Sequence, residues 1–103
     1  MRKFDVSEYE VTMENGQTIP YRVKDSAVTI LFNPDRKLNA IELLRTNKLA
    51  ERIMVAEGHV LLEEADYADL KKACETVRGY GKEDVEFVRR ILEAPEINVI
   101  EGK

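Results

Sequence analysis

The ten residues VTMENGQTIP, from Val11 to Pro20, carry the clearest local signal in the chain: an Asn15-Gly16 dipeptide between two runs of alternating apolar residues. Asn-Gly in such a setting is typical of a β-hairpin turn. A hairpin of this kind either closes a small core or offers an edge strand to a partner. The positions of the apolar residues on the two strands help to decide between these alternatives.

The apolar residues on both sides of the turn occupy odd-numbered positions. They are Tyr9, Val11, Met13, Ile19, Tyr21 and Val23. In an antiparallel pair the numbers of opposed residues have a constant sum, and two odd positions oppose each other only if that sum is even. A two-residue turn gives an odd sum, whereas a three-residue loop with a left-handed Gly16 as a bulge opposes Val11 to Ile19. We therefore predict the three-residue loop, with one apolar face buried.

The flanking residues extend this hairpin into a predicted three-stranded antiparallel meander over residues 1–33. Upstream, the alternation shifts near Ser7, which indicates a bulge or bend. Downstream, residues 24–26 have the character of a second turn, and AVTILF (residues 27–32) forms the third predicted strand. Because this strand is apolar on nearly both faces, it is a candidate for the covered interior or for a partner interface. The candidate interface residues are Val28, Ile30, Leu31 and Phe32.

Residues 38–94 have helical patterns, and the first helix has a well-marked start. Asn39 is the predicted N-cap, Glu42 completes a capping box, and Leu38 and Leu43 form a hydrophobic staple. The predicted inward stripe is centred on Leu43, Ala50 and Met54, with Leu44, Leu49 and Ile53 beside it. The helix either continues to about Glu57 or breaks near residues 46–47. We favour one helix.

Two further helices are predicted after a short extended segment at residues 59–62. The first has Asp66 as its N-cap and Gly79 as a left-handed C-cap, and its inward face is Tyr67, Leu70, Cys74 and Val77. The second runs from about residue 82 to residue 94, with Val85, Val88, Ile91 and Leu92 inward. The short connection between them predicts an antiparallel helical hairpin. Residues 96–103 are a tail or an edge strand, the strand being expected at residues 97–100.

Length and composition are consistent with a single α+β domain over residues 1–103. The formal net charge is −4 and 35% of the 103 residues are charged, so nonspecific binding to nucleic acid is not favoured. One cysteine excludes an intramolecular disulfide and a thiolate metal cluster. The sequence lacks the pattern of a secretory leader and has no apolar run of membrane-spanning length. We expect a cytoplasmic protein that does not associate with membranes.

One segment resembles a known group of proteins. The run LEEADYADLKK (residues 62–72), preceded by Ala56-Glu57-Gly58, resembles small uncharacterised proteins of tailed phages and prophages. In that group a helix and a Gly-containing turn precede a Leu-Lys helix. The resemblance covers about the second half of the chain and implies a viral context, in the cytoplasm of a host cell. It implies no catalytic or binding residue.

Acidic residues gather near the only histidine of the chain. Glu63, Glu64, Asp66 and Asp69 are close in sequence to His59 and could bind a cation. However, the calcium-loop pattern is absent, and no second histidine or neighbouring cysteine completes a transition-metal site. Carboxylates at the start of a helix are explained by capping and by the helix dipole. We therefore expect no metal site and no cofactor, and His59 is interpreted as a surface residue.

The remaining reactive side chains do not form a catalytic arrangement. Cys74 lies on a predicted inward helix face and is expected to be a buried apolar residue and not a nucleophile. Neither Ser7 nor Ser26 has a base at a recognisable spacing, and no glycine-rich phosphate loop is present. We expect that the protein is not an enzyme.

Two functions remain. The first is a small accessory or assembly protein that acts through protein–protein contacts, plausibly phage-encoded and homo-oligomeric. The alternative is a nucleic-acid-associated protein that uses Arg45, Lys48 and Arg52, whose spacing at i, i+3 and i+7 predicts one basic ridge on the first helix. The negative net charge and the absence of interleaved aromatic residues disfavour the second function.

Overall fold

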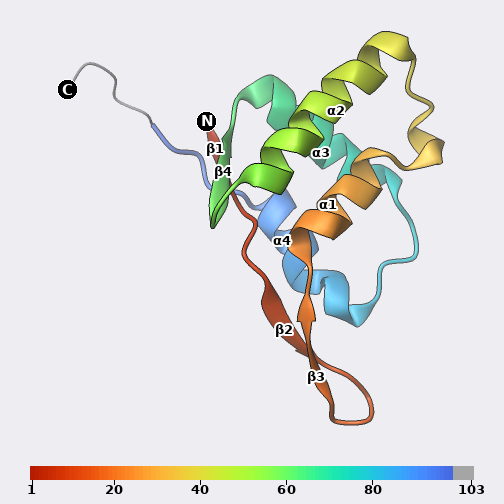
Figure 1. The fold of residues 1–103 in the computed structure, drawn as a ribbon, viewed down its shortest axis with the longest axis vertical. Coiled ribbons are helices and arrows are strands. Elements are labelled where there is room, and N and C mark those ends of the chain that lie inside the picture. Colours follow the sequence, from red (N-terminus) through yellow and green to blue (C-terminus); the bar gives the residue numbers. More distant parts are fainter. Residues whose placement is uncertain (99–103) are drawn as a thin grey trace.

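The computed structural model describes residues 1–98, and strands in the N-terminal part are followed mainly by helices (Figure 1). The elements are β1 (Arg2–Asp5), β2 (Tyr9–Thr12), β3 (Thr18–Tyr21), α1 (Val23–Leu31), η1 (Pro34–Arg36), α2 (Ala40–Val55), β4 (His59–Leu62), α3 (Glu64–Thr76), η2 (Lys82–Asp84) and α4 (Val85–Leu92). The predicted α+β class is confirmed. None of the helices within residues 1–98 is long and apolar enough to cross a lipid bilayer.

The β2–β3 hairpin has the predicted register. Val11 opposes Ile19 and Tyr9 opposes Tyr21. The Gly16 amide donates a hydrogen bond of 2.9 Å to the Met13 carbonyl, and Gly16 has a φ of +83°. A left-handed glycine after a tight turn is the geometry of a three-residue loop with a glycine bulge. The parity of the apolar residues therefore identified the loop correctly.

Only the base of this hairpin is buried. The Tyr9 and Tyr21 rings stack with 4.7 Å between their centroids, and Tyr21 is buried. Towards the tip, Met13 is 43% exposed and Ile19 is 39% exposed. The hairpin projects from the helices (Figure 1), and the outer half of its apolar face is only partly covered by the rest of residues 1–98. The prediction that the whole face is buried was wrong.

The predicted third strand is instead part of the helix α1, so the meander does not form. Val23, Ala27, Ile30 and Leu31 recur at helical spacing and are the buried residues of α1. A short apolar run such as AVTILF is compatible with both a buried strand and a buried helix. The helical spacing of α1 begins at Val23, which lies before this run and was not considered together with it. The β-branched residues of the run favour a strand locally, but packing of the α1 apolar face outweighs that preference.

The strand β1 pairs with β4 in a separate antiparallel sheet. Phe4 opposes Val60, and the Phe4 side chain is fully buried. The other edge of β1 is covered by the chain after α4, where the Lys3 amide donates to the Pro95 carbonyl at 3.0 Å and Arg2 bridges to Glu96. The Ile97 amide donates to the Met1 carbonyl at 2.6 Å, so the C-terminal segment returns to the sheet, but through an isolated bridge at Glu96 and not through a strand within residues 1–98. Residues 99 and 100 of that predicted strand lie outside the described residues.

The helix α2 starts as predicted and continues without a break to Val55. The Glu42 amide donates to the Asn39 side chain at 2.8 Å, and the Asn39 amide donates back to the Glu42 carboxylate at 3.0 Å, which completes the capping box. The predicted inward stripe was correct for Leu49, Ala50 and Ile53, which are buried, and wrong for Leu43 and Met54, which are each 45% exposed, and for Leu44, which is 66% exposed. The buried face is Thr46, Leu49, Ala50 and Ile53. This face is rotated from the predicted one because α2 has apolar residues on several sides and packs closely against α1.

The helices α3 and α4 form the predicted antiparallel hairpin. The Tyr67 hydroxyl donates to the Ile91 carbonyl at 2.8 Å, so the start of α3 lies beside the end of α4. The N-cap of α3 is Glu63 and not Asp66, which shifts the start of the helix by almost one turn. As predicted, Tyr67, Leu70 and Cys74 are buried.

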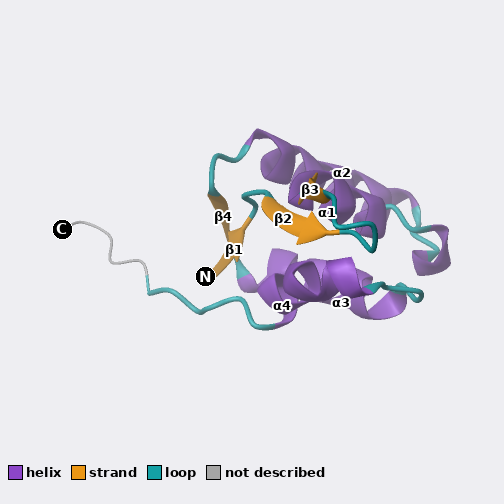
Figure 2. Cartoon of the chain, turned by 90° about the horizontal axis from the view of Figure 1, so that it is seen from below, coloured by secondary structure: helices purple, strands orange, loops and turns teal. Residues whose placement is uncertain are grey.

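The inward face of α4 was predicted only in part. Ile91 is buried as expected, but Val85 is 51% exposed and Leu92 is 39% exposed. The ring of Phe87 takes the central buried position and lies 5.7 Å from that of Tyr21. The aromatic side chain of α4 therefore lies on the inward face of the helix, which the sequence pattern did not indicate. Figure 2 shows α1 and α2 on one side of the molecule and α3 and α4 on the other, with the β2–β3 hairpin between them.

Candidate functional site

The predicted partner interface lies on α1 and at the residue that follows it. Leu31 is fully buried, Ile30 is 5% exposed, and both belong to the core of the chain itself. Val28 is half-buried against the same core, and only Phe32, at 36% exposure, offers a substantial surface. The four side chains do not form one partner surface, because a helix directs consecutive residues to different sides.

The three residues of the predicted basic ridge differ in their contacts. The Arg45 guanidinium donates to both carboxylate oxygens of Asp69, at 3.0 and 3.3 Å. Arg52 donates to the Asp66 carboxylate and to the Leu61 carbonyl, each at 2.7 Å. Both arginines therefore point towards α3 and β4. Lys48 lies on the outer side of the helix and is exposed.

The predicted acidic cluster provides the other half of this contact. Its members are Glu63, Glu64, Asp66 and Asp69. Asp66 and Asp69 lie one turn apart on α3 and pair with the two arginines of α2. Nucleic-acid phosphates or a cation would have to compete with these ion pairs. Within residues 1–98, no three His, Cys, Asp or Glu side chains are grouped as a metal site requires.

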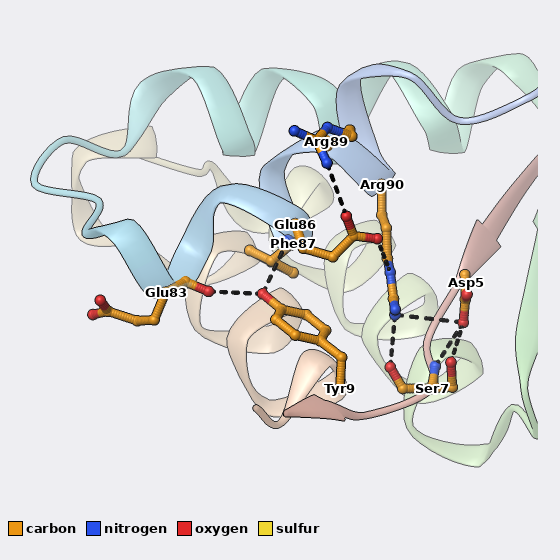
Figure 3. A network of polar contacts seen from close by, with 8 residues as sticks. All are labelled: Asp5, Ser7, Tyr9, Glu83, Glu86, Phe87, Arg89 and Arg90. Carbon is orange, nitrogen blue, oxygen red and sulfur yellow. Dashed lines mark hydrogen bonds and ion pairs between the residues drawn. The ribbon is translucent and has the colours of Figure 1, made fainter. Parts of the chain in front are cut away.

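A second polar network joins the start of the chain to α4 (Figure 3). Arg90 donates to the Ser7 carbonyl at 2.6 Å and to the Glu86 carboxylate at 2.9 Å. Its guanidinium carbon lies 4.9 Å from the centroid of the Tyr9 ring. The Tyr9 hydroxyl donates to the Glu83 carbonyl at 2.8 Å and accepts from the Phe87 amide at 3.1 Å. The network fixes the base of the hairpin against α4.

Asp5 belongs to the same network and has a lowered pKa. Burial alone would raise the pKa of this carboxyl group. The two hydrogen bonds that Ser7 donates and the Arg90 guanidinium outweigh burial and hold the pKa below its usual value. The ionised carboxylate therefore helps to form the bend at Ser7. Because the polar atoms of the network already contact one another, this arrangement stabilises the fold and does not form a reaction site.

The single thiol is not placed for nucleophilic chemistry. Cys74 is 2% exposed, and burial raises the pKa of its thiol, so the reactive thiolate is disfavoured. The nearby Tyr80 hydroxyl donates to the Cys74 carbonyl at 2.9 Å. His59 is exposed on β4. The predicted burial of Cys74 and the predicted exposure of His59 are both confirmed.

A hollow of about 680 Å³ lies between the tip of the hairpin and η2. It is lined by residues 11–15 together with Lys82 and Glu83. All of these residues except Val11 are exposed, so a ligand in the hollow would remain open to water. Small-molecule sites usually enclose their ligand and direct a few polar groups at it. This hollow lacks that arrangement.

The most unusual surface is the outer side of α2. Ile41, Leu44 and Val55 are 77%, 66% and 79% exposed, and Lys48 and Glu51 lie between them in the helix. These five residues follow the spacing i, i+3, i+7, i+10 and i+14, which places them in one row along a helix. We call this row, residues 41, 44, 48, 51 and 55, the outward stripe. It lies on the side of the helix opposite the buried residues Leu49 and Ile53.

The outward stripe was missed in the sequence because Leu44 was assigned to the inward side. The spacing of Ile41, Leu44 and Val55 at positions typical of a helix–helix seam was the signal that could have identified it. That signal competes with a second apolar row, Leu49 and Ile53, on the same helix. The packing of α2 against α1 accompanies the burial of the row that contains Leu49 and Ile53.

The comparisons with known proteins add no relative. No protein-family model, no curated protein and no solved structure matches the chain. The resemblance to small tailed-phage proteins therefore stays a prediction from the sequence.

Proposed function

We propose that this chain is a protein-interaction module that binds through the outward stripe of α2 and acts as an accessory or assembly factor without catalysis. The observation that supports this proposal is the alignment of Ile41, Leu44 and Val55, each at least 66% exposed, in one row. Single exposed apolar residues are ordinary, but an apolar surface with polar residues around and within it is typical of a binding site.

The geometry of a helix makes the stripe suitable for a protein partner. Apolar anchors at i, i+3 and i+14 can lie along a second helix or in a groove of a partner. Leu43 and Met54, each 45% exposed, extend the apolar surface on one flank. On the other flank, Arg45 and Arg52 are held in place by their ion pairs with α3. The stripe is thus displayed on a helix whose position is fixed.

The alternative functions have less support. Nucleic-acid binding needs free cations, and two of the three residues predicted for it are paired with aspartates. A viral context would agree with an assembly role, but it rests on the sequence resemblance alone. The proposed role in binding other proteins, by contrast, depends only on the exposed apolar residues of the outward stripe.

Affinity capture with matched variants tests the proposal. The chain is expressed with an affinity tag in a host cell, crosslinked, and its captured proteins are identified by mass spectrometry. We expect that Leu44→Gln and Ile41→Gln each remove the proteins that the wild type captures. Val85→Gln on α4 is the matched control, because Val85 is also an exposed apolar residue, at 51%, but lies outside the stripe.

The captured protein is then purified and titrated against each variant by calorimetry. Binding to the wild type and to Val85→Gln, with weak or no binding to Leu44→Gln, supports the proposal. An identical set of captured proteins for all variants contradicts it. Circular dichroism of each variant shows whether the variant is still folded, so that a loss of binding is not caused by unfolding.

A further inference from the structure

We infer that the partner of the outward stripe is a second copy of the chain, bound antiparallel through α2 so that Lys48 of each copy faces Glu51 of the other. This inference rests on the proposed function, since it names the occupant of the same surface. It is carried by the order of apolar and charged residues along the stripe and by their exposure.

The spacing of the stripe is that of a two-helix seam. Steps of three and four residues keep side chains in line with a neighbouring helix that crosses at a small angle. From Ile41 to Val55 the stripe is about 21 Å long, since an α-helix rises about 1.5 Å per residue. It therefore extends along nearly the whole length of α2 (Ala40–Val55).

The antiparallel register follows from residue numbers. The stripe residues alternate between the a positions (41, 48 and 55) and the d positions (44 and 51) of a coiled-coil seam. In an antiparallel helix pair, a positions of one helix pack against d positions of the other, so the residue numbers of contacting residues have a constant sum. The residue numbers of Leu44 and Val55 have the same sum as those of Lys48 and Glu51. One register thus places leucine on valine and lysine on glutamate. The two-fold axis repeats each contact, which gives two apolar and two charged pairs.

Two other arrangements of the same two helices oppose like charges. A parallel pair in register places Lys48 against Lys48 and Glu51 against Glu51 of the other copy. An antiparallel pair centred on residue 48 also places the two lysines together. Like charges in contact across an interface are unfavourable. The charge order along the stripe therefore disfavours both of these arrangements, whereas the register described above pairs opposite charges and also pairs apolar residues with apolar residues.

Within residues 1–98 of one copy, neither Lys48 nor Glu51 has an ion-pair partner. The Glu51 carboxylate accepts a hydrogen bond of 3.1 Å from the Asn47 amide, and both side chains are exposed. By contrast, Arg45 and Arg52 on the same helix are paired within the chain. Polar residues inside an apolar seam commonly fix its register at some cost in affinity. Lys48 and Glu51 are suited to that role.

The expected dimer is weak. One pair of short helices forms a small interface, which is typical of transient complexes. Sedimentation equilibrium over the micromolar to millimolar range is the appropriate measurement, with the wild-type chain as the reference. We expect a reversible monomer–dimer equilibrium for the wild type and for Val85→Gln. Leu44→Gln affects both apolar pairs, so its dimer should dissociate about tenfold or more readily.

Charge reversal tests the register. Lys48→Glu alone opposes two glutamates in each of the two charged pairs, and Glu51→Lys alone opposes two lysines. Each variant should therefore dimerise about tenfold more weakly than the wild type. A mixture of the two variants can form a heterodimer in which both charged pairs are attractive again. We expect its affinity to return to within about threefold of the wild type.

Native mass spectrometry of isotope-labelled Lys48→Glu mixed with unlabelled Glu51→Lys detects the heterodimer directly. Random pairing of equal amounts of the two variants gives about twice as much heterodimer as either homodimer, so a heterodimer fraction well above this statistical proportion supports the inference. The statistical proportion, or wild-type affinity in each single variant, would overturn the register. A wild-type chain that stays monomeric at millimolar concentration would overturn self-association altogether. If Leu44→Gln still loses captured proteins in that case, the proposed function stands with a different partner, so the two failures are distinguishable.

Discussion

Two sides of α2 differ in how their charges are matched. On the side that faces α3, Arg45 and Arg52 meet Asp69 and Asp66 of the same chain. On the outward stripe, Lys48 and Glu51 have no ion-pair partner among residues 1–98, and the apolar residues beside them stay exposed. The difference shows that the presence of charged residues does not tell whether a helix face is used within the fold. What tells it is whether those residues form ion pairs with the same chain. The following substitutions test this contrast between the two sides and the buried face.

The largest effect is expected from the buried face of α2. Ile53 is fully buried, and Ile53→Ala leaves a cavity between α2 and the core. We expect the free energy of unfolding to fall by about 2 to 5 kcal/mol, measured by urea denaturation. Val55→Ala on the outward stripe is the control, because Val55 is 79% exposed and its loss should have little effect on stability. Equal destabilisation by both variants would mean that the buried and outward faces are assigned wrongly.

The N-cap of α2 should have an intermediate effect. Asn39→Ala removes the acceptor for the Glu42 amide and should lower the free energy of unfolding by about 1 kcal/mol. The first turn then frays, and this turn carries Ile41 of the outward stripe but no buried residue. Hydrogen exchange should therefore increase most at residues 40–43, and near Ile53 it should increase only by the smaller factor that corresponds to the lower free energy of unfolding. Uniformly faster exchange along α2 would contradict this separation.

The ion pairs that face α3 should contribute less. A double-mutant cycle of Arg52→Gln and Asp66→Asn should give a coupling energy of about 0.2 to 1 kcal/mol that decreases with added salt, since the pair is partly exposed. The cycle removes the separate contribution of the Arg52 hydrogen bond to the Leu61 carbonyl. A coupling energy of zero at low salt would show that this side is not closed by charge pairing.

The smallest effect on stability is expected from the outward stripe itself. Leu44 is 66% exposed, so Leu44→Gln should change the free energy of unfolding by at most about 0.5 kcal/mol when the protein is monomeric. Thermal unfolding at low protein concentration measures this change. A large loss of stability would show that Leu44 packs within the chain, and its surface would then not be free for a partner.

Features determined by neighbouring residues were predicted well from the sequence. The hairpin register followed from the parity of Val11 and Ile19, and the start of α2 followed from Asn39 and Glu42. In each case the interacting groups are a few residues apart, so the local pattern contains the necessary information. The antiparallel arrangement of α3 and α4 followed in the same way from their short connection.

Features determined by distant residues were not predicted. The segment AVTILF became a helix because the face containing Ala27 and Leu31 packs in the core, and local preference did not reveal this. The candidate basic ridge and acidic cluster were considered separately because nothing in the sequence shows that Arg45 lies beside Asp69. The outward stripe became recognisable only when the opposite side of α2 was known to be buried.

The position of β1 has a consequence for how the chain folds during synthesis. The strand β1 is synthesised before both of its neighbours, since it pairs on one edge with β4 and on the other with residues near Glu96. Contacts between residues so far apart form late, because a long loop must close first. The β2–β3 hairpin and α1 can form from local contacts while β1 still lacks both neighbours. The strand β1 is thus completed after elements that follow it in the chain, and translation beyond residue 95 is needed before both of its edges are covered.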